Sequence, residues 1–236
     1  MRWLSRSGAM TLLGAGCVAV WQNGEAQSRG GGGGARIAGR VTILEKKNKP
    51  ASDLGAAVLY LEAGAAPAAR PTTVEIAMDD KDFVPRVLVV PVGSKIRFAN
   101  HDPFDHNVFS AGEPNPFDLG QYGRGEAKGF TFTSPGLVRI FCNIHPRMVA
   151  FVQVLASPYY AQPAADGSFA IDGVPPGQYT LHAWHERSPE VTEPVTVGAA
   201  GTTLPDIQLD ARGFRWKPHK NKYGQDYPTS AGVERY

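Results

Sequence analysis

Cysteine is scarce in this sequence. The 236-residue chain has two, Cys17 and Cys142, too few for the disulfide framework that stabilises many small secreted domains. An excess of charge is also missing, because 24 Lys and Arg against 22 Asp and Glu give a net charge of +2. That balance argues against the concentrated basic face of a nucleic-acid-binding protein. No window shows a sustained helical period, so the chain is predicted to be all-β.

The chain also lacks a long hydrophobic run. The apolar segment of residues 9–21 is short for a transmembrane helix, and it follows Arg2 and Arg6. With small residues before the cut, this is the pattern of a secretory signal peptide cleaved after Ala26. The alternatives are a buried or amphipathic helix, and a lipoprotein signal that would attach the chain to a membrane through Cys17. We therefore expect an exported protein of the bacterial periplasm.

Cleavage of this signal would leave Cys142 as the one cysteine of the mature chain. A single thiol in an oxidising compartment cannot form an internal disulfide. The segment FCNIHPRM places Cys142, His145 and Met148 at the spacing C-x2-H-x2-M. A short turn can wrap these side chains around one centre, whereas a straight strand would point them to alternate faces. Thiolate, thioether and imidazole favour copper, and a second His, which DHNVFS offers as His106, would complete the blue-copper ligand set.

Three other interpretations of Cys142 stay open. Cys142 is a buried structural thiol if His145 is only a surface residue and Met148 only fills the core. Zinc binds Cys and His, although a structural zinc site needs four firm ligands and Met is a poor one. A Cys–His nucleophile is the third, and no base-orienting or oxyanion-hole motif accompanies it. The sequence has no H-x-H pair, which argues against the trinuclear copper cluster of an oxidase.

The motifs HNV and C-x2-H-P-x-M, with the strand pattern FVPRVLVVPVGSKIRFAN before them, resemble the cupredoxins, and most closely the amicyanin-like ones. The resemblance covers about residues 72–156. It implies a Greek-key β-sandwich with one type 1 copper per chain, held by His106, Cys142, His145 and an axial Met148. It also implies that Asn107 braces the two ligand loops from outside the metal's immediate ligands.

The same resemblance implies an electron carrier rather than an enzyme. His145, beside Pro146, would be the solvent-facing port through which electrons enter and leave, and Arg147 nearby would favour an acidic partner. Such redox partners meet through small, transient interfaces. The alternatives are a copper-binding or surface-interaction module without electron transfer, and a sandwich that binds polysaccharide or protein through Trp184 or Trp216.

A second β-rich block surrounds the cupredoxin-like segment. DGSFAIDGVPPGQYTLHAW, together with Gly39-Arg40-Val41 and Lys49-Pro50, resembles the carboxypeptidase regulatory-like (transthyretin-like) sandwich. We therefore expect the cupredoxin to be inserted between the second and third strands of that sandwich. The alternative layout gives residues 36–62 to the cupredoxin as leading strands. The stretch 101–128 is rich in Pro, Gly, Asp and Asn and is expected to be a loop.

The predicted layout is a signal peptide (1–26), a Gly-rich tether (27–35), the carboxypeptidase-like sandwich (36–66 and 157–210), the cupredoxin domain (70–156) and a basic tail (211–236).

Overall fold

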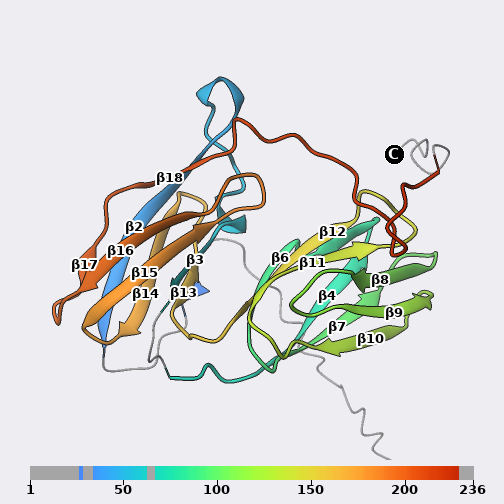
Figure 1. Cartoon of the computed structure of the whole chain (residues 1–236), viewed down its shortest axis with the longest axis horizontal. Coiled ribbons are helices and arrows are strands. Elements are labelled where there is room, and N and C mark those ends of the chain that lie inside the picture. Colours follow the sequence, from blue (N-terminus) through green and yellow to red (C-terminus); the bar gives the residue numbers. More distant parts are fainter. Residues whose placement is uncertain (1–26, 29–33, 63–66, 229–236) are drawn as a thin grey trace, which may run out of the picture.

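The computed structural model describes residues 27–28, 34–62 and 67–228, and the predicted signal peptide lies outside them. The fold is all-β, as predicted (Figure 1). Two short 3-10 helices, Lys46–Asn48 and Leu54–Ala56, are the helical elements of the described residues. None of the helices in this part of the chain is long and apolar enough to cross a membrane.

The first of two β-sandwiches, here called the companion sandwich, combines strands from both ends of the chain. One sheet has the order β1-β13-β3-β15-β16, and the other has the order β14-β2-β17, with β18 also pairing with β2. Its core is apolar and includes Ile37, Leu61 and Leu209, all fully buried. The strands are β1 (Gln27–Ser28), β2 (Ala35–Leu44), β3 (Val58–Glu62), β13 (Tyr160–Gln162), β14 (Ser168–Val174), β15 (Gly177–Trp184), β16 (Val191–Val197), β17 (Thr202–Thr203) and β18 (Ile207–Asp210).

The second sandwich, here called the inserted sandwich, is built from the nine strands between β3 and β13. Its sheets have the orders β10-β7-β4-β5 and β6-β12-β11-β8-β9. Its core contains Phe98, Phe132 and Ile140. The strands are β4 (Thr73–Asp79), β5 (Asp82–Val84), β6 (Val87–Pro91), β7 (Lys95–Asn100), β8 (His106–Ser110), β9 (Phe117–Tyr122), β10 (Ala127–Thr131), β11 (Gly136–Cys142) and β12 (Val149–Leu155).

The order of the strands along the chain shows that the inserted sandwich interrupts the companion sandwich. Strands β2 and β3 precede it, and both pair with strands that follow it, β2 with β14 and β3 with β15. This arrangement places residues 36–62 in the companion sandwich, so they are not leading strands of the inserted one. The domain boundaries predicted near residues 66, 70 and 156 stay predictions.

Two expectations about irregular segments were wrong. Residues 101–128 contain strands β8 and β9, which pair with each other and join the sheet through β11. Their polar, Gly-containing sequence favours a loop, but sheet pairing overrides that local preference. In the predicted tether, Gln27–Ser28 pairs with β13 and Ala35 already belongs to β2.

The two sandwiches contact each other through an apolar cluster. Val58, Tyr160 and Trp184 of the companion sandwich pack with Val87 and Phe151 of the inserted one. The rings of Phe151 and Trp184 lie 5.4 Å apart between centroids. Their burial ties the sandwiches together, because removing apolar surface from water is the main favourable term in such contacts.

The tail leaves β18 and crosses to the inserted sandwich (Figure 1). No strand occurs in its described part, residues 211–228. It is anchored where the metal-ligand motif lies: the Lys222 N–H donates to Asn143 Oδ1 at 2.9 Å, and the Tyr227 hydroxyl donates to the Cys142 carbonyl at 2.7 Å. The His219 ring stacks on Phe141 at 4.4 Å. The tail therefore lies against the segment that carries Cys142.

Candidate metal centre

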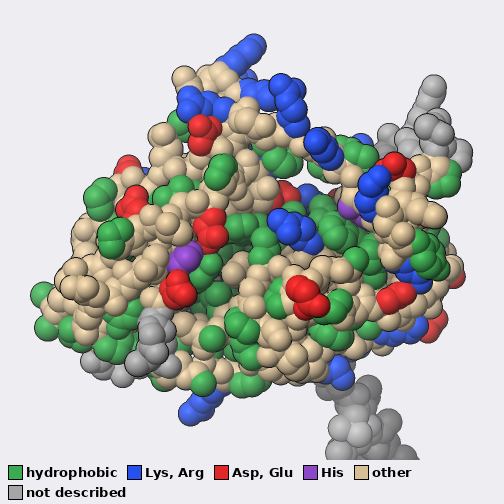
Figure 2. Space-filling view, in the orientation of Figure 1, with side chains coloured by type: hydrophobic (Ala, Val, Ile, Leu, Met, Phe, Trp, Pro, Cys, Tyr) green, Lys and Arg blue, Asp and Glu red, His purple; other side chains and the backbone are tan. Residues whose placement is uncertain are grey.

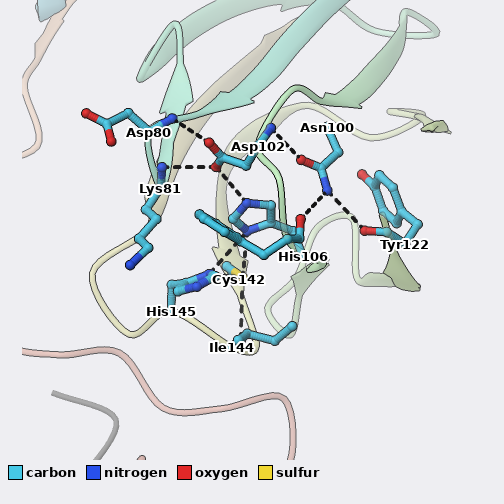
Figure 3. Close-up of polar contacts among 10 residues, drawn as sticks. Asp80, Lys81, Asn100, Asp102, His106, Tyr122, Cys142, Ile144 and His145 are labelled. Carbon is cyan, nitrogen blue, oxygen red and sulfur yellow. Dashed lines mark hydrogen bonds and ion pairs between the residues drawn. The ribbon is translucent and has the colours of Figure 1, made fainter. Parts of the chain in front are cut away.

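Three of the predicted ligands meet in the inserted sandwich. The Cys142 Sγ lies 3.6 Å from His106 Nδ1 and 3.6 Å from His145 Nδ1, and the two Nδ1 atoms are 3.2 Å apart. All three side chains are buried, and Figure 3 shows them facing one another. Within the described ranges they form the one group of three His, Cys, Asp or Glu side chains close enough to share a metal ion.

The spacing of these atoms fits a metal. A triangle with these sides has its centre about 2.0 Å from each corner, close to the metal–nitrogen and metal–sulfur bond lengths of about 2.0 and 2.3 Å seen at zinc sites. The donor atoms, one thiolate sulfur and two imidazole nitrogens, suit copper or zinc.

Cys142 and His145 come together because β11 ends in a closed turn. Along β11, Val138, Ile140 and Cys142 are buried on one face, as strand alternation requires. Beyond Cys142 the chain turns back: the Met148 N–H donates to the His145 carbonyl at 3.1 Å, and the Cys142 N–H donates to the Met148 carbonyl at 3.4 Å. The segment between the ligands is therefore a compact loop that leads directly into β12.

His106 is the first residue of β8 rather than part of a loop. Its Nδ1 faces Cys142, and its Nε2 lies 2.8 Å from the Asp102 carboxylate. Burial lowers the pKa of His106, and the hydrogen bond to Asp102 opposes that effect. A carboxylate on the far nitrogen of a ligating histidine fixes the ring's orientation and tautomer, leaving Nδ1 free to bind a metal.

Asp102 is held by the turn between β4 and β5. Its carboxylate accepts hydrogen bonds from the N–H groups of Asp80 and Lys81, at 2.8 and 3.0 Å (Figure 3). Both residues have positive φ, 52° and 58°, a conformation that costs non-glycine residues of order 1 kcal/mol each or more. Burial alone would raise the pKa of Asp102, but the Lys81 N–H, His106 and the Asp80 N–H together lower it.

Asn100 frames the same segment. The Asn100 Oδ1 accepts the Asp102 N–H at 2.9 Å, and its Nδ2 donates to the carbonyls of Phe104 and Tyr122. Neither Asn100 nor Asp102 was identified from the sequence as a residue that supports the site. The sequence does show a carboxylate four residues before His106. Its role could not be inferred, because it depends on the turn between β4 and β5, which lies beside Asp102 only in the folded chain.

Asn107 joins the ligand segments through its main chain. Its carbonyl accepts the Asn143 N–H at 3.0 Å, linking β8 to the Cys142–Met148 loop. The side chain donates through Nδ2 to Asp118 of β9 at 2.6 Å. Its Oδ1 is buried without a hydrogen-bond partner. Asp118 also pairs with Lys222 of the tail at 2.7 Å.

The Cys142 thiol is fully buried and forms no disulfide. Burial raises its pKa, because a thiolate loses hydration inside the protein. The Ile144 N–H points at Sγ from 3.4 Å and favours the thiolate in part. A cation between the three donor atoms would supply the remaining stabilisation of the charged sulfur.

For the other predicted residues the structure gives mainly their burial. Met148 is fully buried in the same core cluster as Cys142, and its thioether remains a predicted axial ligand. His145 is 8% exposed and Pro146 is partly exposed, so little of the predicted port reaches the surface. Away from the site, His182 lies between Glu62 and Glu190 on the companion sandwich.

Comparison with known proteins gives partial matches. Residues 150–204 match the family model of polysaccharide lyase family 4, domain II. This segment is less than half of the chain and lies mostly in the companion sandwich. The likeness of that sandwich to the carboxypeptidase regulatory-like fold stays a prediction. A search of curated proteins found no match.

Several solved structures are similar to part of this chain. A copper-containing nitrite reductase from Thermus scotoductus is 33% identical over 41% of this chain, with a TM-score of 0.34, and the match spans 25% of the reductase. A purple cupredoxin from Nitrosopumilus maritimus is 22% identical over 35% of this chain and 99% of its own, with a TM-score of 0.32. An oxidised amicyanin variant is 23% identical over 35% of this chain and 81% of its own, with a TM-score of 0.33.

The chain is thus all-β with cupredoxins among its structural neighbours, and it contains a buried His–Cys–His group.

Proposed function

We propose that this chain is a type 1 copper protein that carries single electrons between partner proteins. The observation that carries the proposal is the buried triangle of His106 Nδ1, Cys142 Sγ and His145 Nδ1, with sides of 3.2 to 3.6 Å. Two imidazoles and one thiolate with a weak axial thioether are the ligand set of such sites, and Met148 is the proposed axial ligand. When bound, copper supplies the change between Cu(II) and Cu(I).

The residues of this chain hold the donor atoms in place before a metal binds. Asp102 fixes the His106 ring, and the Asn107 carbonyl ties β8 to the loop that carries the other ligands. Because the donors are held by the fold, they need move little when the charge of the site changes, and a low reorganisation cost suits electron transfer. Burial of all three donors keeps water away from the metal.

Electrons would pass through His145 and Pro146, where the partly exposed Pro146 brings the loop to the surface. Partners would be redox proteins that dock transiently, with neither nucleic acid nor, unless Cys17 is acylated, a membrane involved. The proposal includes export to the periplasm through residues 1–26. The mass of the protein recovered from cells tests this part, since cleavage after Ala26 and acylation at Cys17 give different masses.

Copper titration tests the central claim. One equivalent of Cu(II) should produce an intense visible thiolate-to-copper band, and Cys142→Ser should abolish it. Tyr223→Phe, an exposed substitution on the tail, is the matched control and should keep the band. A colourless one-to-one complex would contradict a type 1 site.

Reduction separates a carrier from a store. Cycles with a small redox dye should bleach and restore the band without loss of metal. Release of copper on reduction would instead favour the copper-binding module without electron transfer.

A further inference from the structure

A cavity of about 310 Å³ lies between the two sandwiches and beneath the tail. One wall is formed by β11 and β12 of the inserted sandwich, and a second by the segment that follows β15. The tail forms the third. Figure 2 shows Lys and Arg side chains along the arch of the tail, above a hollow between the two halves of the molecule. Ligand sites favour such positions between domains, and small-molecule pockets start at about this volume.

The charges that line the cavity do not balance. Four cations line it, and Glu186 is the one acidic side chain among its lining residues; the cations are Arg86, Arg139, Arg147 and Lys217. Arg86 and Glu186 neutralise each other in a two-pronged ion pair, at 2.9 and 2.8 Å.

The other three cations have no ion pair with a carboxylate in the described part of the chain. Asp82 lies near enough to Arg86 and Arg147 to feel their charge, but it does not line the cavity. The walls therefore carry a surplus of positive charge.

Flat apolar surfaces accompany this charge. Trp184 and Trp216 both line the cavity, together with Phe141, Phe151 and Phe214. The Arg147 guanidinium lies over the Trp216 ring, 5.6 Å from its centroid. This contact uses one face of the guanidinium and leaves its N–H groups, which lie in the guanidinium's own plane, available to a ligand. Trp216 is 48% exposed, unusual for so large an apolar side chain.

Unmet hydrogen-bonding capacity is present in the same walls. His185 is fully buried, and its Nδ1 accepts the Arg187 N–H at 3.4 Å. In the neutral ring the hydrogen is therefore on Nε2, which has no hydrogen-bond partner. The Asp53 carboxylate is 3.7 Å away, beyond hydrogen-bond distance. A buried donor without an acceptor is costly and rare in native structures.

We propose that this cavity binds a small organic anion, a carboxylate attached to a flat apolar ring. The carboxylate would pair with Arg139, Arg147 and Lys217, and the ring would lie against the tryptophans. Guanidinium groups bind carboxylates through paired, charge-assisted hydrogen bonds, which are stronger than neutral ones. The volume of the cavity admits a molecule of this size. A folded partner would not fit inside it, since the tail forms one of its walls. The proposal is independent of whether the His–Cys–His group holds copper.

Calorimetric titration of the metal-free full chain tests the proposal, with benzoate as the probe and benzyl alcohol as its uncharged counterpart. Benzoate should bind with one-to-one stoichiometry, and benzyl alcohol at least tenfold more weakly. Arg147→Gln and Arg139→Gln should each weaken benzoate binding about tenfold or more, as loss of a charged hydrogen bond implies. Arg124→Gln, an exposed change in the turn between β9 and β10, is the control and should leave the affinity unchanged.

Tryptophan fluorescence supplies a second readout. Trp184 and Trp216 are the two tryptophans of the described residues, and both line the cavity. Benzoate should change their emission, and Trp216→Phe should reduce that change.

Three results would overturn the proposal: no saturable benzoate binding at millimolar concentration, equal binding of benzyl alcohol, or an equal loss of affinity in Arg124→Gln.

Discussion

The companion sandwich and the inserted sandwich have the same architecture of two packed sheets, and they differ in what they bury. Of the ten buried polar or charged residues in the part of the chain that the structure describes, nine lie in the inserted sandwich, between Ser94 and Gln153. The tenth, His185, follows β15 of the companion sandwich and lines the cavity between the two. The core of the companion sandwich is otherwise built from apolar side chains.

By this difference the inserted sandwich contains the candidate site, and the companion sandwich is a scaffold. A buried polar group costs free energy unless it is hydrogen-bonded, so a fold that buries several together has a use for them. In the inserted sandwich Asn100, Asp102, His106 and His145 gather at one end, and two strained residues of the β4–β5 turn support them. The companion sandwich has no such group in its described residues.

Truncation of the two cores is expected to have the largest effect on stability. Leu61 and Ile140 are fully buried, one in each sandwich. Leu61→Ala and Ile140→Ala should each lower the free energy of unfolding by about 2–5 kcal/mol, from lost burial and the cavity left behind. Urea denaturation measures this loss. Copper affinity should fall in Ile140→Ala, two residues before Cys142, and stay unchanged in Leu61→Ala. A loss of copper affinity in folded Leu61→Ala would contradict this division of roles between the two sandwiches.

The Asp102 network should respond next. In Asp102→Asn the new amide cannot accept from all three donors now facing the carboxylate. We expect a loss of about 1–3 kcal/mol of stability from the unsatisfied groups and of about 10–100-fold in copper affinity. Asp105→Asn, an exposed change in the same segment, is the control. Chelator competition and urea denaturation measure both; equal effects of the two variants would deny Asp102 a role at the metal site.

Loss of one tail contact should have a smaller effect. Tyr227→Phe removes the hydrogen bond from the hydroxyl to the Cys142 carbonyl and should cost about 0.5–1.5 kcal/mol. Tyr223→Phe removes a hydroxyl from a side chain that is 73% exposed and should cost nothing measurable. Urea denaturation compares them. Equal stabilities would show that this hydrogen bond adds nothing to the stability of the protein.

The smallest expected effect is on the pH dependence of the tail. Burial would raise the pKa of Asp118, but Lys222 and Asn107 lower it below its usual value. A lowered carboxyl pKa stabilises the contact above the unfolded pKa of about 4, and this contribution disappears as pH falls through the folded value. The protection of residues 219–227 from hydrogen exchange, taken relative to the intrinsic exchange rate at each pH, should therefore fall below about pH 4. Lys222→Met should show the faster exchange already at pH 7, and unchanged exchange there would contradict a role for the pair.

The local parts of the site were predictable from the sequence. The spacing of Cys142, His145 and Met148 within one turn depends on seven consecutive residues, and alternation places Cys142 inside β11. His106 was predicted as a ligand from its chemistry, yet its strand was missed, because the polar stretch around it resembles a loop until β9 and β11 pair with β8. Asp102 was missed because its donors come from a turn twenty residues earlier.

The all-β class and the residue types that meet at the site could be predicted from the sequence, because they depend on short-range alternation, spacing and side-chain chemistry. The insertion was predicted from the resemblance of two separated segments to one sandwich family, and the pairing of β2 with β14 and of β3 with β15 agrees with it. Tertiary structure alone decided which polar residues are buried, how Asp102 holds His106, and where the tail lies. It also formed the cationic cavity, whose walls come from three distant segments. Burial and charge balance depend on neighbours that are remote in sequence, so no local pattern records them.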